Sequence, residues 1–248
     1  NIYDALYDYS DRIRHILTVD EQGACYAADG YARATGKTGV VLATSGPGAT
    51  NLVTGIANAY MDSIPLVAIT GNVASNMIGK DSFQEIYITG CTMPITKHNF
   101  VVRKVEELAP ILRRAFDIAE SGRKGPVLVD LPKDITAALT DYVPVEPSDK
   151  PQGGAVAEPS STDLDLVRKL IQTAERPLIY AGGGMISGQA EEALLALMEK
   201  AQIPACHTIM GIGALPDAHP LLHHSVKGFR RRSRGCVKGL TRSASPSK

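Results

Sequence analysis

The stretch from Asp20 to Asn51 constrains the fold of this chain more than any other part. Its first half is rich in alanine and ends at Gly36, which predicts a closely packed helix with a left-handed cap. Val40–Thr44 is a short apolar run between glycines, typical of a strand covered on both faces. A Ser-Gly-Pro-Gly turn over residues 45–48 then opens the next helix. This order of helix, buried strand, glycine turn and helix favours an α/β fold.

The same alternation continues on both sides of this stretch. We predict further strands at Ile13–Thr18, Pro65–Thr70 and Pro126–Leu131, and helices at residues 1–10, 51–60 and 106–120. Residues 74–100 are less regular, and we assign them no strand. Strands that alternate with helices imply parallel βαβ units with both faces of the sheet covered.

A second, smaller α/β unit is predicted after residues 144–162, which are rich in Pro, Gly and Ser and are interpreted as a linker. Its elements are predicted helices at 163–175 and 189–201 and strands at 177–181 and 203–208. Two strands cannot close a doubly wound core, so this domain is predicted to be incomplete. We therefore divide the chain into a first domain (1–143), a linker, a partial domain (163–222) and a tail (223–248).

Charge and composition exclude several classes of protein. Residues 226–248 hold eight of the 26 Lys and Arg residues and no acid, which leaves 18 basic against 26 acidic residues in 1–225. An acidic body argues against nucleic-acid binding, and the basic tail has no pattern that predicts packed structure. No apolar run suggests a membrane span and no signal peptide is recognised, so we expect a cytoplasmic protein. The scattered cysteines and the histidines at 219–224 lack ligand spacing, so no metal ligands are predicted.

Polar or flexible residues follow several of the predicted strands directly. Glu21, the turn with Pro47 and Gly48, and Lys133 each come just after a strand candidate. Because the carboxyl ends of parallel strands share one edge of a sheet, these residues are candidates for a single binding crevice. Simpler interpretations stay open: an acid favoured by the dipole of a helix's first turn, a common glycine turn, and a solvated lysine.

A weaker signal lies in the second unit. Gly182, Gly184 and Gly188 form a turn one residue longer than the dinucleotide-binding fingerprint. The turn indicates a nucleotide near a helix N-terminus and does not identify it.

Several long motifs occur in order along residues 1–222, namely DEQGACYAADGYARATGK, SGPGATNLVTGIANAY, DSFQE, ITKHN and GPVLVDLPKDI. In these motifs the chain resembles the catalytic large subunits of acetolactate (acetohydroxyacid) synthases, which are thiamine-diphosphate enzymes. The resemblance implies a pyrimidine-binding domain with a parallel sheet, followed by part of an FAD-associated central domain. Asp20 and Asn72 depart from the family pattern, which has histidine and glutamine there.

The resemblance also implies roles for individual residues. Glu21 corresponds to the glutamate that bonds to the aminopyrimidine of thiamine diphosphate and promotes removal of its C2 proton. Gln84 corresponds to a glutamine beside the cofactor, and Phe83 to a phenylalanine of the acceptor pocket. Lys97 and Lys133 correspond to lysines at the entrance for anionic ketoacids. The residues implied in FAD contacts are Arg123, Gly184, Thr208 and Ile209.

The activity implied is decarboxylation of pyruvate and carboligation to a second 2-ketoacid, the first common step of branched-chain amino-acid biosynthesis. The implied cofactors are thiamine diphosphate, Mg²⁺ and FAD, and the implied partners are a second copy of the subunit, as a homodimer or tetramer, and a regulatory small subunit. The Mg²⁺ ligands would lie in a C-terminal domain that follows these residues, so we expect this chain to be an inactive fragment. Other thiamine-diphosphate enzymes, such as pyruvate oxidase or sulfoacetaldehyde acetyltransferase, and an inert interaction module remain as alternatives.

Overall fold

A computed structural model of the chain describes residues 1–146 and 158–223. All of the tail predicted at 223–248 except His223, and most of the predicted linker, lie outside the described residues. The chain divides into two compact units, Asn1–Val156 and Ala157–Lys248. The finer domain boundaries given above stay predictions, and each unit is described by itself.

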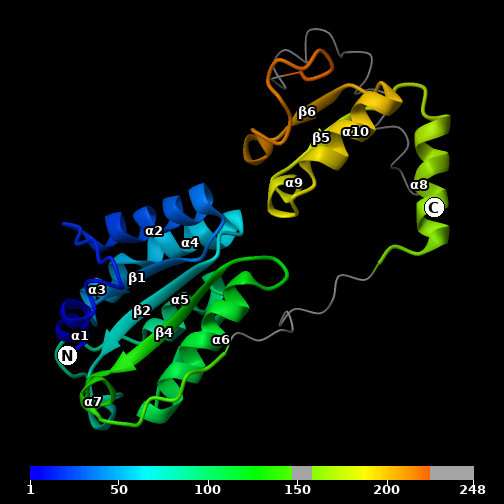
Figure 1. Ribbon diagram of the computed structural model, residues 1–248. Helices are drawn as coiled ribbons and strands as arrows, with labels where there is room; N and C mark the ends of the chain where they lie inside the picture. The colour runs from blue at the N-terminus through cyan, green and yellow to red at the C-terminus, as the bar shows by residue number, and fades with distance from the viewer. Residues whose placement is uncertain (147–157, 224–248) are drawn as a thin grey trace. The chain divides into compact units, whose positions relative to one another are not determined.

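The first unit is built on one parallel sheet of four strands (Figure 1). The strand order is β1-β2-β4-β3, with bounds Gly39–Ala43, Leu66–Asn72, Pro126–Pro132 and His98–Val101, respectively. β4 lies inside the sheet and all seven of its residues are buried, which explains its nearly continuous apolar sequence. The predicted α/β class with a parallel sheet is therefore confirmed.

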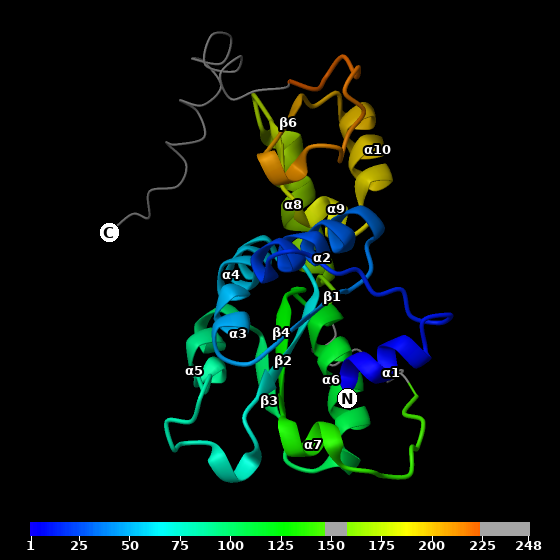
Figure 2. The same cartoon turned by 90° about the vertical axis from the view of Figure 1, so that its left-hand side faces the viewer.

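Helices cover both faces of this sheet, as Figure 2 shows. One face packs against α2 (Glu21–Thr35), α3 (Pro47–Asn51), α4 (Val53–Asp62) and α5 (Ile88–Thr92). The other face packs against α6 (Leu108–Glu120), with contributions from α1 (Ile2–Asp8) and α7 (Lys133–Ala137). Short 3₁₀ turns lie at Ser75–Met77 (η1), Met93–Ile95 (η2) and Val105–Glu107 (η3).

The caps of α2 follow from its sequence. Asp20 is the N-cap, and its carboxylate accepts a hydrogen bond of 3.1 Å from the Gly23 amide. Gly36 closes the helix with a φ of 71°, as the sequence predicted. Between these caps the helix lies directly on β1: a β-carbon at Gly39 would stand 2.2 Å from the Ala28 carbonyl oxygen.

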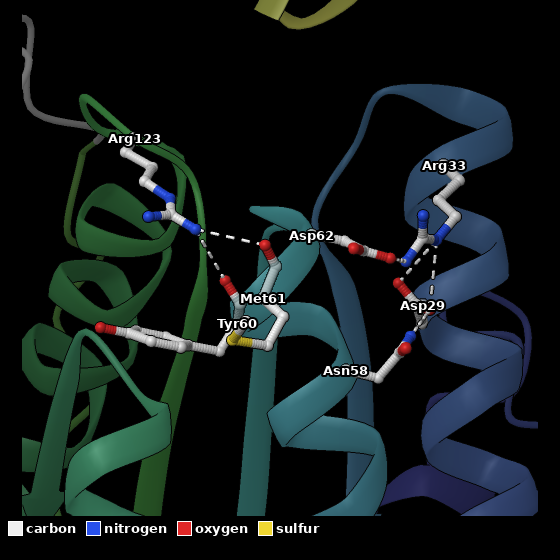
Figure 3. A network of polar contacts seen from close by, with 7 residues as sticks. All are labelled: Asp29, Arg33, Asn58, Tyr60, Met61, Asp62 and Arg123. Carbon is white, nitrogen blue, oxygen red and sulfur yellow. Dashed lines mark hydrogen bonds and ion pairs between the residues drawn. The ribbon is translucent and has the colours of Figure 1, made fainter. Parts of the chain in front are cut away.

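A network of polar contacts ties α2 to α4 (Figure 3). The buried carboxylate of Asp29 accepts hydrogen bonds from Arg33 at 3.1 and 3.2 Å and from Asn58 at 2.9 Å. Arg33 also donates to Asp62 at 2.7 Å, near the end of α4. Burial would lower the pKa of Arg33, but its hydrogen bonds to Asp62 and Asp29 raise it. The network therefore fixes the relative position of the two helices on this face of the sheet.

We expect Arg33→Met to lower the free energy of unfolding by roughly 2–4 kcal/mol, because it leaves a buried carboxylate without its cationic partner. Chemical denaturation of the purified chain measures this change. The matched control is Arg168→Met, which removes an ion pair with Asp165 in which both side chains are about 70% exposed. That control should change stability by less than about 1 kcal/mol. Equal effects of the two substitutions would contradict a structural role for the network.

The predicted strand at Ile13–Thr18 is wrong. These residues form no strand, and the side chains of Ile16 and Leu17 are 67% and 80% exposed. Among the described residues β1 is an edge strand with a free side, and the segment makes no ladder with it. Without the hydrogen bonds of such a ladder, a segment with apolar and β-branched residues does not form a strand.

α5 and β3 were not predicted from the sequence: α5 lies within the stretch 74–100 that was assigned no strand, and β3 begins at its end. β3 is a four-residue edge strand in which no residue is fully buried, and its first two residues are polar. Such a short edge strand lacks the apolar run that identifies β1, β2 and β4.

The second unit contains β5 (Ile179–Ala181) and β6 (Ala205–His207), paired in parallel. Its helices are α8 (Ser161–Thr173), α9 (Gly184–Ser187) and α10 (Glu191–Ala201), followed by the 3₁₀ turn η4 (Ile209–Gly211). The buried core is formed by Ala181, Leu194, Met198, Ala205, Leu215 and Leu222. The two predicted strands of this unit are confirmed. Within residues 1–146 and 158–223 no helix has the length and apolarity needed to cross a bilayer.

Candidate functional site

Glu21 is the first residue of α2 and lies at the carboxyl edge of the sheet, beside the turn that follows β1. Its Oε2 accepts a hydrogen bond of 3.0 Å from the Asn51 side-chain amide, which projects from the end of α3. A β-carbon at Gly48 would lie 3.3 Å from the other oxygen, Oε1. Within the described residues Oε1 accepts no hydrogen bond. Asn51 thus holds one oxygen of the carboxyl group, and the other oxygen is available to a ligand.

The glycine turn after β1 approaches a second segment of the chain. Gly46 has a φ of 62°, and a β-carbon there would lie 2.7 Å from the Gln84 carbonyl oxygen. Pro47 follows as the first residue of α3, where its fixed φ suits a helix start. The turn therefore holds the backbone of the DSFQE motif beside the residues that contact Glu21. Phe83 in this motif is 88% exposed.

Lys133 also lies at the carboxyl edge, as the first residue of α7 directly after β4. Its side chain is exposed and, in the described parts of the chain, forms no ion pair. The next residue, Asp134, accepts hydrogen bonds from the Ser75 amide at 2.8 Å and hydroxyl at 3.0 Å. The backbone hydrogen bond from Ser75 lowers the pKa of Asp134. Lys133 and the segment that leads to Phe83 are thus attached to the same edge.

Two of the predicted site residues lie at the opposite edge. The backbone amide of Lys97 donates to Pro126 at the start of β4, and its ammonium group donates to the carbonyls of Ile118 and Ser121 near the end of α6. Burial lowers the pKa of this lysine. Arg123 donates to the Ser63 hydroxyl at 2.7 Å and to carbonyl oxygens at the end of α4 (Figure 3).

The structure does not bring Lys97 close to Glu21, and the ketoacid-binding role of Lys97 stays a prediction. The physical reason is the direction of the strands: residues that precede a parallel strand lie at the opposite edge from residues that follow it. The sequence assignment rested on the ITKHN motif alone. Arg123 precedes β4 in the same way, and its guanidinium caps α4 in this structure.

Comparison with known proteins identifies the family of this chain. Residues 1–91 match the N-terminal TPP-binding domain of thiamine pyrophosphate enzymes, and residues 164–233 match the central domain of the same enzymes. The chain belongs to the thiamine pyrophosphate enzyme family. The N-terminal match contains Glu21, the glycine turn and Gln84, so the cluster at the carboxyl edge lies within the TPP-binding domain.

Individual relatives agree with this family. The chain is 50% identical over 224 residues to a protein of Arthrospira platensis named acetolactate synthase, covering 89% of this chain and 39% of the relative. It is 52% identical over 226 residues to a probable acetolactate synthase large subunit of Methanocaldococcus jannaschii, covering 88% and 37%. It is 48% identical over 219 residues to the acetolactate synthase isozyme 2 large subunit of Escherichia coli, covering 88% and 39%. The chain spans less than two fifths of the length of these relatives.

Among the residues that match the central domain of this family, three predicted FAD contacts lie at the ends of β5 and β6. The Thr208 amide donates to the Ala181 carbonyl at 2.9 Å, and the Thr208 hydroxyl accepts from the Gly211 amide at 3.2 Å. Gly184 begins α9 after β5, and Ile209 is 83% exposed. These residues form one exposed edge, whereas Arg123 belongs to the other unit.

Two residues of the first unit were not identified from the sequence. Asn51, which holds Glu21, was assigned only to a helix. Asp130 lies buried in β4, where it accepts hydrogen bonds from the Thr70 hydroxyl at 2.7 Å and the Asn72 amide at 2.5 Å. Asn72, where the family pattern has glutamine, is thereby fixed at the end of β2. A lone acid in an otherwise apolar strand was the available signal for Asp130.

We expect Asp130 to make stability depend on pH between about 4 and about 6. Burial raises the pKa of Asp130 from 3.8 to about 6, so the folded chain binds this proton more tightly than the unfolded chain. The free energy of unfolding contributed by this group therefore falls as pH rises through that window, by at most about 3 kcal/mol. Asp130→Asn should remove this slope.

The measurement is urea denaturation of the parent and variant chains between pH 4 and pH 7. Carboxyl groups whose pKa is lowered, such as Glu85 and Asp134, contribute the opposite slope in both proteins and cancel in the difference. Asp165→Asn, on an exposed face of α8, serves as the matched control. Stability curves of Asp130→Asn and parent that run parallel over this range would contradict the prediction.

Proposed function

We propose that this chain is part of an acetolactate synthase large subunit, which decarboxylates pyruvate and joins the resulting two-carbon unit to a second 2-ketoacid. The observation that supports this most strongly is the position of Glu21. Its carboxyl group, held by Asn51 and placed against Gly48, lies in a chain about 50% identical to proteins named acetolactate synthase. We propose further that this reaction serves branched-chain amino-acid synthesis in the cytoplasm.

The site suits the aminopyrimidine of thiamine diphosphate. A ring nitrogen needs a carboxyl oxygen that is fixed in place and free to form one hydrogen bond, and Oε1 of Glu21 meets both conditions within the described residues. Gly48 keeps the start of α3 close to this oxygen, because any side chain there would also meet Thr44 at 2.7 Å. Bound thiamine diphosphate supplies the carbon nucleophile. Glu21 holds or moves the proton that converts the aminopyrimidine into a base.

Phe83, Gln84 and Lys133 are proposed to shape the substrate side of the same edge. Gln84 lies where its backbone contacts the Gly46 turn, and we propose that its side chain flanks the cofactor. An exposed aromatic ring at Phe83 suits the apolar part of the acceptor ketoacid. An exposed ammonium at Lys133 suits the carboxylate of pyruvate or of the acceptor.

FAD and Mg²⁺ are further proposals that rest on the family resemblance. Gly184, Thr208 and Ile209 offer an exposed edge of backbone and side chains for FAD, and Arg123 is a candidate from the other unit. Among residues 1–146 and 158–223, no three His, Cys, Asp or Glu side chains gather to hold a metal ion. The resemblance assigns the Mg²⁺ ligands to a later domain. Homodimers or tetramers and a regulatory small subunit are the proposed assemblies.

The experiment that tests this function uses a chimaera of residues 1–222 of this chain and the part of the Arthrospira platensis relative that follows the aligned region. With thiamine diphosphate, Mg²⁺ and FAD, the chimaera should form acetolactate from pyruvate, and 2-aceto-2-hydroxybutyrate when 2-ketobutyrate is added. Formation of acetate or acetyl phosphate instead would favour another thiamine pyrophosphate enzyme. A folded chimaera with no product would contradict the proposed function.

We expect Lys133→Met to raise the KM of the chimaera for pyruvate about tenfold, which corresponds to the loss of one ionic contact worth about 1.4 kcal/mol. Stability should change little, because the side chain is exposed and forms no ion pair in the described residues. Lys37→Met is the matched control, since Lys37 is exposed at the opposite edge, between α2 and β1. Steady-state kinetics of both variants decide the point. An unchanged KM in Lys133→Met would exclude the ketoacid role.

A further inference from the structure

The segment that carries Phe83 and Gln84 has an unusual backbone. Asp81 and Gln84 have φ values of 53° and 58°, in the left-handed region that residues other than glycine rarely adopt. Gly79 shares this region with a φ of 80°. Three such residues within six positions do not form a regular helix or strand, so their conformation requires contacts that hold it.

The contacts come from a carboxylate at the end of the segment. Oε1 of Glu85 accepts a hydrogen bond from the Gly79 amide, and Oε2 accepts one of 2.8 Å from the Ser82 amide. The Glu85 amide in turn donates to the Ser82 carbonyl at 3.0 Å. Hydrogen bonds from the Ser82 and Gly79 amides lower the pKa of Glu85, so the carboxylate form is favoured. One side chain thus closes the loop from residue 79 to residue 85.

Phe83 and Gln84 lie inside this closed loop. The Gly46 turn packs against this loop from outside. The two backbones are so close that a β-carbon at Gly46 would clash with the backbone of Gln84. A separate contact, between Ser75 and Asp134, anchors the beginning of the segment to α7. Glu85 is therefore the side chain that sets the direction of residues 83 and 84 relative to the carboxyl edge.

We propose that Glu85 is a positioning residue that holds Phe83 and Gln84 over the cofactor edge and so determines the fit of the acceptor ketoacid. This inference rests on the proposed function for its substrate, but the order of the loop is testable without activity. Glu85 itself has both oxygens engaged by backbone amides and is not assigned a contact with substrate.

The first experiment uses the 248-residue chain and limited proteolysis. Lys80 and Phe83 are exposed cleavage sites for trypsin and chymotrypsin inside the loop. We expect Glu85→Ala to accelerate cleavage at both sites about tenfold, as read by mass spectrometry. Glu85→Gln should have a smaller effect, because a glutamine offers one acceptor oxygen where the carboxylate offers two. Glu106→Ala, at an exposed position in η3, should leave the rates unchanged.

The second experiment measures kinetics in the chimaera. We expect Glu85→Ala to raise the KM for 2-ketobutyrate as the acceptor about tenfold while kcat changes less than threefold, with Glu85→Gln intermediate. If Glu85 contributed only to overall stability, its substitution would not raise KM while leaving kcat nearly unchanged. An inactive parent chimaera would contradict the proposed function and leave the proteolysis test standing. Unchanged cleavage in Glu85→Ala, or faster cleavage with an unchanged acceptor KM, would overturn the inference about Glu85.

Discussion

Glu21→Gln in the chimaera is expected to lower kcat for acetolactate formation by about 10²- to 10⁴-fold, the usual contribution of a general acid or base. Glutamine keeps the shape of the side chain and its hydrogen bond with Asn51 through one oxygen. It cannot hold or release the proton that the aminopyrimidine requires. The midpoint of chemical denaturation should stay within error of the parent, because Glu21 is only partly buried at the start of a helix.

The matched control separates this role from a helix-dipole effect. Glu191 is the first residue of α10 and partly buried, the same helical position that Glu21 has in α2. Glu191→Gln loses the same favourable charge at a helix N-terminus and should leave kcat unchanged. If Glu21→Gln also kept its activity within a few-fold of the parent, the carboxyl group would have only the structural role.

Gly39→Ala is expected to destabilise the first unit by about 2–4 kcal/mol, at or above the usual cost of overpacking a core. A β-carbon at this position would stand 2.2 Å from the Ala28 carbonyl oxygen and 3.2 Å from a methyl carbon of Leu66. The carbonyl belongs to the backbone of α2 and cannot move unless the whole helix moves away from β1. Urea denaturation of the purified chain measures the loss.

Gly30→Ala is the control for this substitution. Gly30 lies on the exposed side of α2, and a β-carbon built there meets nothing within 4 Å apart from the backbone of its own helix. Because alanine is the better helix former, this variant should be more stable by up to about 1 kcal/mol. Two glycines near the same helix should therefore respond with opposite signs. Similar stabilities for the two variants would show that α2 does not pack on β1 as closely as described.

Much of the fold could be predicted because the buried strands are nearly continuous apolar runs. β1, β2 and β4 follow the predicted ranges within two residues, and the cap at Gly36 and the two strands of the second unit were also predicted. Glu21 lies beside the glycine turn as expected, although the strand Ile13–Thr18 that was expected to place it there does not form. Local sequence is sufficient where one face or both faces of an element are fully buried.

The features that could not be predicted depend on contacts between residues that are far apart in the sequence. Ile13–Thr18 has the composition of a strand but no ladder among the described residues. Lys97 was placed near the ketoacid entrance from its motif alone, and the sequence did not show that its ammonium group donates to carbonyl oxygens near the end of α6. Asn51 could be assigned only to a helix, because its hydrogen bond with Glu21 depends on the packing of α3 beside α2. Neither the adjacent residues nor the hydrophobic periodicity of the sequence indicates these contacts.

We propose that Glu21 activates bound thiamine diphosphate. This role is measured most directly by the exchange of the C2 proton of the bound cofactor for deuterium, followed by NMR after rapid acid quench. This measurement needs no ketoacid, so it isolates the carboxyl group from Phe83, Lys133 and the loop closed by Glu85. In the chimaera we expect exchange to slow by at least about 10²-fold in Glu21→Gln, and to stay at the parent rate in Glu191→Gln. Exchange in Glu21→Gln at the rate of the parent would contradict this role of Glu21.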